Sequence, residues 1–60
     1  MTDKDRLKDA LEHEEFAVNL YRNYARATGD ERLKEMFEQF AMNESWHAAA
    51  IRVKLQALKE

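Results

Sequence analysis

Apolar side chains recur at alternating steps of four and three residues through the first half of the chain. This heptad spacing places them on one stripe of an α-helix that faces other helices. Glu14 occupies one position of the stripe, and Ala10, Ala17 and Tyr24 widen it. The pattern predicts a helix over about residues 3–27. The stripe consists of Leu7, Leu11, Glu14, Val18, Tyr21 and Ala25.

The second half of the chain repeats this spacing and predicts a helix over about residues 31–58. Glu44 and His47 interrupt its stripe, and Met36, Ala41 and Ala48 flank it. The stripe is expected to form the buried seam of this helix. It consists of Leu33, Phe37, Phe40, Glu44, His47, Ile51, Leu55 and Leu58.

The segment 28–30 separates the two helices and contains Gly29, the only glycine of a chain without proline. Gly29 is expected to adopt the left-handed conformation that ends many helices, and Asp30 to cap the second helix. Thr2 or Asp3 is expected to cap the first. Lys54 and Lys59 lie towards the end of the second helix, where its dipole favours positive charge. The sequence therefore predicts an all-α fold, in which residues 1–60 form a single domain, an antiparallel two-helix hairpin.

Two helices cannot cover each other's apolar side chains, so a hairpin of 60 residues needs further stabilisation. The chain has no cysteine, which excludes disulfides and fits a reducing cytoplasm. The simplest solution is a homodimer in which two hairpins form a four-helix bundle. Assembly of such dimers into a higher homo-oligomer is the alternative.

Charge and hydropathy exclude several classes of function. The net charge is −2, and no basic patch or run of like charge indicates nucleic-acid binding. No apolar run is long enough to cross a bilayer, and no signal peptide is visible. These features predict a cytoplasmic protein without nucleic-acid or membrane partners.

Glu14, Glu44 and His47 are the candidate chemistry of the chain. Glu14 precedes Gly29 by as many residues as Glu44 follows it, so folding back at the turn brings both to one level. Glu44 and His47 lie one helical turn apart on one face. Because two carboxylates and an imidazole in an apolar seam need a charge partner, we expect a metal site. Such ligands suit iron or manganese, with zinc as a substitute.

Alternatives for these positions follow from the same pattern. The three residues could form a polar layer that fixes helix register without a metal. Glu15 competes with Glu14 but lies at the edge of the stripe, and His13 lies off it. Tyr21 is expected in the core, with a role beside the metal as an alternative. Trp46 is expected to cover a dimer or higher-order contact.

Residues 7–52 resemble the ferritin-like superfamily, and its rubrerythrin branch most closely. Residues 14–25 are similar to the first iron-binding helix of rubrerythrins, which carries Glu-x-x-Ala-x-Asn-x-Tyr; the match assigns the ligand to Glu14. Glu44 and His47 match the Glu-x-x-His ligands of the second helix. Rubrerythrins have four helices in one chain, whereas this chain resembles encapsulated ferritins, whose site forms between two-helix subunits.

The resemblance implies two iron ions per dimer, with Glu14, Glu44 and His47 of each chain as metal ligands and catalytic residues. It implies a ferroxidase that oxidises Fe(II) with O₂ or peroxide, in iron storage or detoxification. It also implies an encapsulin-like shell as a partner, and so a location inside a protein nanocompartment. Rubrerythrin-like peroxide scavenging and a non-enzymatic helical dimerisation module are the alternative functions.

Overall fold

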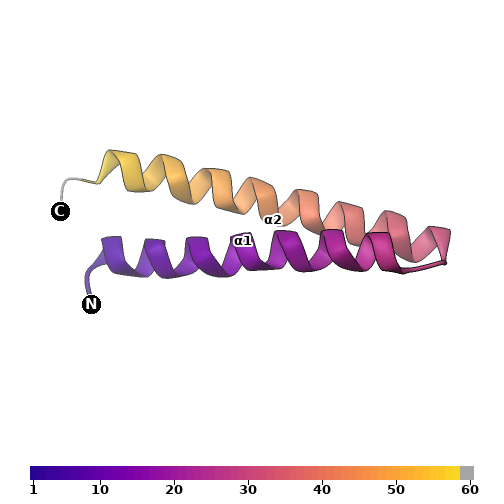
Figure 1. The fold of residues 1–60 in the computed structure, drawn as a ribbon. Helices are drawn as coiled ribbons and strands as arrows, with labels where there is room; N and C mark the ends of the chain where they lie inside the picture. Colours follow the sequence, from indigo (N-terminus) through magenta and orange to yellow (C-terminus); the bar gives the residue numbers. More distant parts are fainter. Residues whose placement is uncertain (59–60) are drawn as a thin grey trace.

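The computed structural model describes residues 1–58, which form two α-helices packed side by side as a hairpin. Helix α1 spans Asp3–Ala27 and helix α2 spans Glu31–Ala57. Figure 1 shows them antiparallel, with the start of α1 and the end of α2 at the same end of the molecule. The predicted all-α hairpin is confirmed, and no strand occurs among residues 1–58. The predicted role of Lys59 lies outside the described residues.

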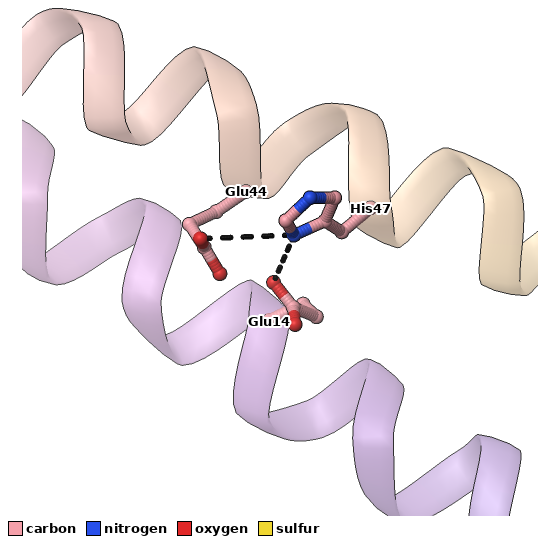
Figure 2. Close-up of side chains that lie close together, drawn as sticks. All are labelled: Glu14, Glu44 and His47. Atoms are coloured by element: carbon pink, nitrogen blue, oxygen red, sulfur yellow. Dashed lines mark ion pairs between the residues drawn. The ribbon is translucent and has the colours of Figure 1, made fainter.

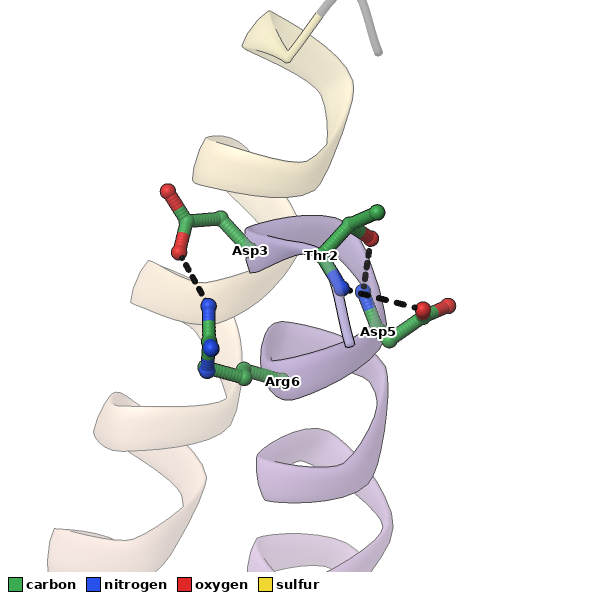
Figure 3. A network of polar contacts seen from close by, with 4 residues as sticks. All are labelled: Thr2, Asp3, Asp5 and Arg6. Carbon is green, nitrogen blue, oxygen red and sulfur yellow. Dashed lines mark hydrogen bonds and ion pairs between the residues drawn. The ribbon is translucent and has the colours of Figure 1, made fainter.

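Side-chain caps fix where each helix begins. The Thr2 hydroxyl accepts a hydrogen bond from the Asp5 N–H at 3.1 Å, and the Asp5 carboxylate accepts one from the Thr2 N–H at 3.2 Å (Figure 3). This reciprocal pair satisfies two amides that the first helical turn leaves without partners. An ion pair of 2.9 Å between Asp3 and Arg6 lies beside the cap. Asp30 caps α2 by accepting from the amides of Arg32 and Leu33.

The expectation of a left-handed Gly29 is wrong, because no residue of segment 28–30 has a positive φ. Helix α1 ends instead at Ala27 and is followed by Thr28, the capping residue, whose backbone is extended, with φ −76° and ψ 141°. The Asp30 N–H donates to the Thr28 hydroxyl at 3.2 Å. A Cβ atom built on Gly29 would meet nothing within 4 Å. The turn is therefore set by the side chains of Thr28 and Asp30.

The contact between the helices is lined by small side chains. The buried apolar residues are Val18 and Ala25 of α1 and Ala41 and Ala48 of α2. Large side chains stay partly exposed, since a single pair of helices can cover only one stripe of each. The hairpin core is thus narrow and leaves most of the apolar surface for another contact.

The predicted seam of α2 is therefore partly wrong. Ala41 and Ala48, placed at its flank, are the residues buried against α1. Leu33, Phe40 and His47 are exposed in the hairpin. At about 100° per residue, Phe40 and His47 lie roughly a quarter turn around the helix from Ala48. They form a second stripe, beside the first.

The Phe40 end of this second stripe belongs to an apolar face on one side of the hairpin, in the half next to the turn. Tyr21 stacks on Phe37 with ring centroids 6.3 Å apart and meets Phe40 edge-on at 5.4 Å. Tyr24 meets Phe37 edge-on at 5.4 Å. We call this surface the apolar face. It consists of Tyr21, Tyr24, Leu33, Met36, Phe37 and Phe40, with the predicted metal ligands beside them.

Further apolar side chains lie away from this face. Phe16, Trp46 and Val53 are each more than 60% exposed, at 69%, 64% and 65%. Neither α1 nor α2 has the length and apolar character needed to cross a membrane. The predicted role of Trp46 at a dimer or higher-order contact stays a prediction.

Candidate metal centre

Glu14, Glu44 and His47 converge between the two helices (Figure 2). Glu14 comes from the middle of α1, while Glu44 and His47 come from successive turns of α2. The His47 Nδ1 atom lies 3.4 Å from Glu14 Oε2 and 3.7 Å from Glu44 Oε1. One candidate ligand atom from each residue lies within 4.8 Å of the others. Glu14 precedes Glu44 by 30 residues in the sequence, yet the two side chains meet at one level of the hairpin, as their equal spacing from the turn predicts.

The three side chains differ in exposure. Those of Glu14 and Glu44 are 24% and 25% exposed, whereas that of His47 is 61% exposed. Glu14 Oε2 is fully buried and has no hydrogen-bond partner among the described residues. A buried carboxylate oxygen without a hydrogen bond loses its hydration, and the His47 ring at 3.4 Å offers this oxygen only an ion-pair contact. The hairpin alone therefore leaves this atom unsatisfied.

The electrostatics of the cluster favour an added cation. Hydrogen bonding with Glu14 raises the pKa of the Glu44 carboxyl, and burial and the Glu14 charge raise it further. His47 opposes these effects. Two adjacent carboxylates disfavour the doubly ionised state unless positive charge lies between them. A divalent cation would remove this repulsion and also satisfy Glu14 Oε2.

The donor set fits iron. Carboxylate oxygens and an imidazole nitrogen are ligands of Fe, Mn and Zn, and no thiolate is available in this chain. One hairpin offers only these three residues, and within residues 1–58 no other carboxylate or histidine joins them. The exposed side of His47 leaves the cluster open, so a second protein surface can complete the coordination.

The competing residues lie elsewhere. Glu15 points away from the cluster and forms an ion pair of 3.4 Å with Arg52 across the opposite side of the hairpin. His13 Nδ1 lies 2.8 Å from the Asp9 carbonyl oxygen. This hydrogen bond and, after it, the negative charge of the Asp9 side chain raise the pKa of His13. His13 is largely exposed and stays on its own helix. Neither Glu15 nor His13 belongs to the cluster of candidate metal ligands.

The sequence predicted all three residues of the cluster but not the ion pair between Glu15 and Arg52 on the opposite side of the hairpin. Tyr21 packs among aromatic rings, in agreement with a core role on the apolar face. The cross-helix pair of Glu15 and Arg52 was not expected. Its signal is the position of both residues on the polar flank beside the seam, since such flanks of neighbouring helices meet.

An antiparallel hairpin that carries Glu on one helix and Glu-x-x-His on the other is half of the ligand set of a ferritin-like carboxylate protein. The family model for rubrerythrin matches residues 5–60, and the chain belongs to the rubrerythrin family. Membership indicates a ferritin-like domain of the di-iron type, and members usually bind iron. Comparisons with curated proteins and with solved structures found no match.

Proposed function

We propose that this protein is a di-iron oxidoreductase whose metal site forms between two copies of the chain. In this arrangement the apolar faces of two hairpins pack together into a four-helix bundle. Glu14, Glu44 and His47 of both chains hold two iron ions at the level of the cluster. A two-fold axis doubles the three ligands of one hairpin into the set of four glutamates and two histidines that ferritin-like sites use.

The observation that carries this proposal is the unsatisfied Glu14 Oε2 beside a second carboxylate and an exposed imidazole. A layer that only fixed helix register would pair its buried polar atoms. Here one buried oxygen, Glu14 Oε2, stays without a hydrogen bond, and the like charges of Glu14 and Glu44 lie close together. A metal ion is the group that answers both features.

The apolar face explains how the protein would support the chemistry. When bound, the iron pair supplies two electrons for the reduction of an oxidant. The glutamates of the cluster neutralise the positive charge, and His47 offers a neutral nitrogen. Phe40 lies one helical turn from Glu44, and Tyr21, which meets it edge-on, lies two turns from Glu14; a second copy packed on these rings would exclude water from the surface beside the cluster.

Fe(II) is the proposed substrate, and O₂ or hydrogen peroxide the proposed oxidant. This ferroxidase activity would serve iron storage or detoxification. Because a two-helix dimer cannot enclose a mineral, storage would take place in a larger assembly or in an encapsulin-like shell. Manganese or zinc would substitute for iron in binding but not in turnover.

Peroxide scavenging is the second candidate, and the family match favours it. Here the iron site is resident, peroxide is the substrate, and an external donor returns the electrons. Stopped-flow oxidation of the Fe(II)-loaded protein separates the two functions. A much faster reaction with hydrogen peroxide than with O₂ favours scavenging, whereas repeated turnover of added Fe(II) with O₂ favours the ferroxidase.

An anaerobic Fe(II) titration of the metal-free protein, followed by air, tests the site itself. We expect saturation near one iron per chain and ferric absorbance on oxidation. Glu14→Gln should lose this stoichiometry, while its matched control Glu15→Gln should keep it. If the protein binds no iron but remains dimeric, it is the non-enzymatic helical module, and the site proposal is wrong.

A further inference from the structure

A shallow hollow lies on the side of the hairpin where the ion pair of Glu15 with Arg52 spans the two helices. Its volume is about 230 Å³, and its buried floor is formed by Val18 of α1 and Ala48 of α2. Polar side chains form its walls. They are Glu15, Asn19 and Arg22 of α1 and Ser45 and Arg52 of α2. The proposed function uses none of these residues, and a second copy packed on the apolar face would leave the hollow open.

Two guanidinium groups line the hollow from opposite ends. Side chains on an α-helix lean towards its N-terminus. Because α1 and α2 are antiparallel, Arg22 leans away from the turn and Arg52 leans towards it. Among residues 1–58, Arg22 forms no ion pair or hydrogen bond, and Arg52 forms one ion pair, of 3.4 Å with Glu15. Since each guanidinium has five N–H donors, most of these donors are free to bind an anion.

Hydrogen-bond acceptors in the same hollow restrict which anion fits. The Ser45 hydroxyl donates to the Ala41 carbonyl oxygen at 2.9 Å, so it can offer a ligand only its lone pairs. The ionised Glu15 carboxylate is also an acceptor without a proton to donate. Glu15 repels an anion that has lost all its protons, whereas an anion that keeps a hydroxyl group can donate to Glu15 or Ser45. The hollow therefore suits a ligand that accepts several hydrogen bonds and donates one.

We propose that this hollow binds inorganic phosphate as the hydrogenphosphate ion. The charged oxygens of the ion accept hydrogen bonds from Arg22, Arg52 and the Asn19 amide. Its remaining P–OH group donates to Glu15 or Ser45. One water occupies about 30 Å³ in the liquid, so the hollow has room for an ion of five heavy atoms and some of its hydration. The bound ion links α1 to α2 and should stabilise the metal-free hairpin.

The proton on the ligand distinguishes free phosphate from similar anions. Sulfate has the same shape but carries no proton near neutral pH, and a carboxylate ion has no hydroxyl group to donate. A phosphate group could also come from a phosphate monoester, which loses its last proton at a pKa of about 6. Above about pH 7 the monoester presents only charged oxygens, and Glu15 opposes it as it opposes sulfate. Free phosphate is therefore the ligand that the hollow favours.

Titration of the metal-free full chain, followed by NMR at about pH 7.5 and constant ionic strength, tests this proposal. We expect saturable shifts of the Asn19 side-chain amide with phosphate, and at least about tenfold weaker binding of sulfate and of glycerol phosphate. Arg22→Gln should weaken phosphate binding about tenfold, because it removes a charge-assisted hydrogen bond. Arg26→Gln removes the same charge one helical turn away, outside the hollow, and should change the affinity less than about twofold.

Glu15→Gln tests the recognition of the proton. Because this variant lacks the charge that repels sulfate, sulfate should bind to it about as tightly as phosphate does. Shifts that do not saturate, equal binding of phosphate and sulfate by the wild type, or equal losses in Arg22→Gln and Arg26→Gln would overturn the proposal. So would a monoester that binds as tightly as free phosphate. The titration contains no iron, so its outcome is independent of the proposed metal site.

Discussion

At the scale of single residues, Glu14 is a proposed metal ligand that should lower stability when no metal is bound. Its Oε2 atom is buried without a hydrogen-bond partner in the hairpin. Glu14→Leu should therefore stabilise the metal-free protein by about 1 kcal/mol, because it removes an unsatisfied polar group from an apolar seam. The same change should abolish the stabilisation that the proposed iron binding would provide. Urea unfolding with and without Fe(II) measures both effects.

Glu15→Leu is the matched control for this experiment. It removes the exposed ion pair with Arg52, which should change the free energy of unfolding by less than about 1 kcal/mol. If the proposed site binds iron, Fe(II) should stabilise this variant and the wild type equally. A metal-free Glu14→Leu protein that is less stable than the wild type would mean that Glu14 is satisfied in solution and needs no cation.

Glu44 gives the metal-free protein a definite pH dependence. Its pKa is raised above 4.5 by Glu14 and by burial, so the folded state favours the protonated carboxyl. The stability from this group is fully present below the unfolded pKa and is lost as the pH rises through the folded value. The proposed iron binding should have the opposite pH dependence, since it needs the ionised carboxylate and should weaken with acid.

Urea unfolding of metal-free wild type and Glu44→Gln between pH 4 and about pH 7 tests this dependence. Because Gln carries no charge, the variant should gain stability relative to wild type as the pH rises above about 4.5. A constant difference across this range would show that Glu44 titrates at the same pH in both states. His13, which also has a raised pKa, is present in both proteins and cancels in the comparison.

At the scale of the helices, the turn does not need the conformational freedom for which a glycine at a helix end is usually required. Gly29 has no positive φ, and a Cβ atom there meets nothing within 4 Å. Gly29→Ala should therefore stabilise the hairpin by about 0.4–1 kcal/mol, since it restricts only the unfolded chain. Thermal unfolding of the metal-free protein measures it. A clear loss of stability would mean that solution conformers of the turn need a left-handed residue.

Sequence reasoning succeeded for the helices where local chemistry decides. The side chains of Thr2 and Asp30 cap the two helices, so the helix starts can be predicted from these residues. Glu14 and Glu44 lie at one level because they are equally far from the turn in the sequence. Sequence reasoning failed for the buried stripe of α2, because two stripes of this helix have the same spacing. The stripe through Phe40 and His47 and the stripe through Ala41 and Ala48 have the same heptad period, and only close helix packing chooses the alanines.

At the scale of the whole molecule, the proposed site exists only when two hairpins meet, so residues far from the ligands should control iron binding. Phe40 lies on the apolar face and packs against Tyr21, yet it is 38% exposed in the hairpin. Phe40→Glu would place a charge in the proposed bundle core, which costs several kcal/mol when unpaired. Iron binding should fall at least about a hundredfold, although all three ligands remain.

Phe16→Glu is the control, because Phe16 is the more exposed phenylalanine, at 69%, and lies away from the apolar face. It introduces the same charge and should leave iron affinity unchanged. Calorimetric titration with Fe(II) under argon, with sedimentation of each loaded sample, links binding to mass. If Phe40→Glu binds iron as tightly as Phe16→Glu and remains a monomer, one hairpin holds the metal alone. If both variants dimerise and bind equally, the subunits meet through another face.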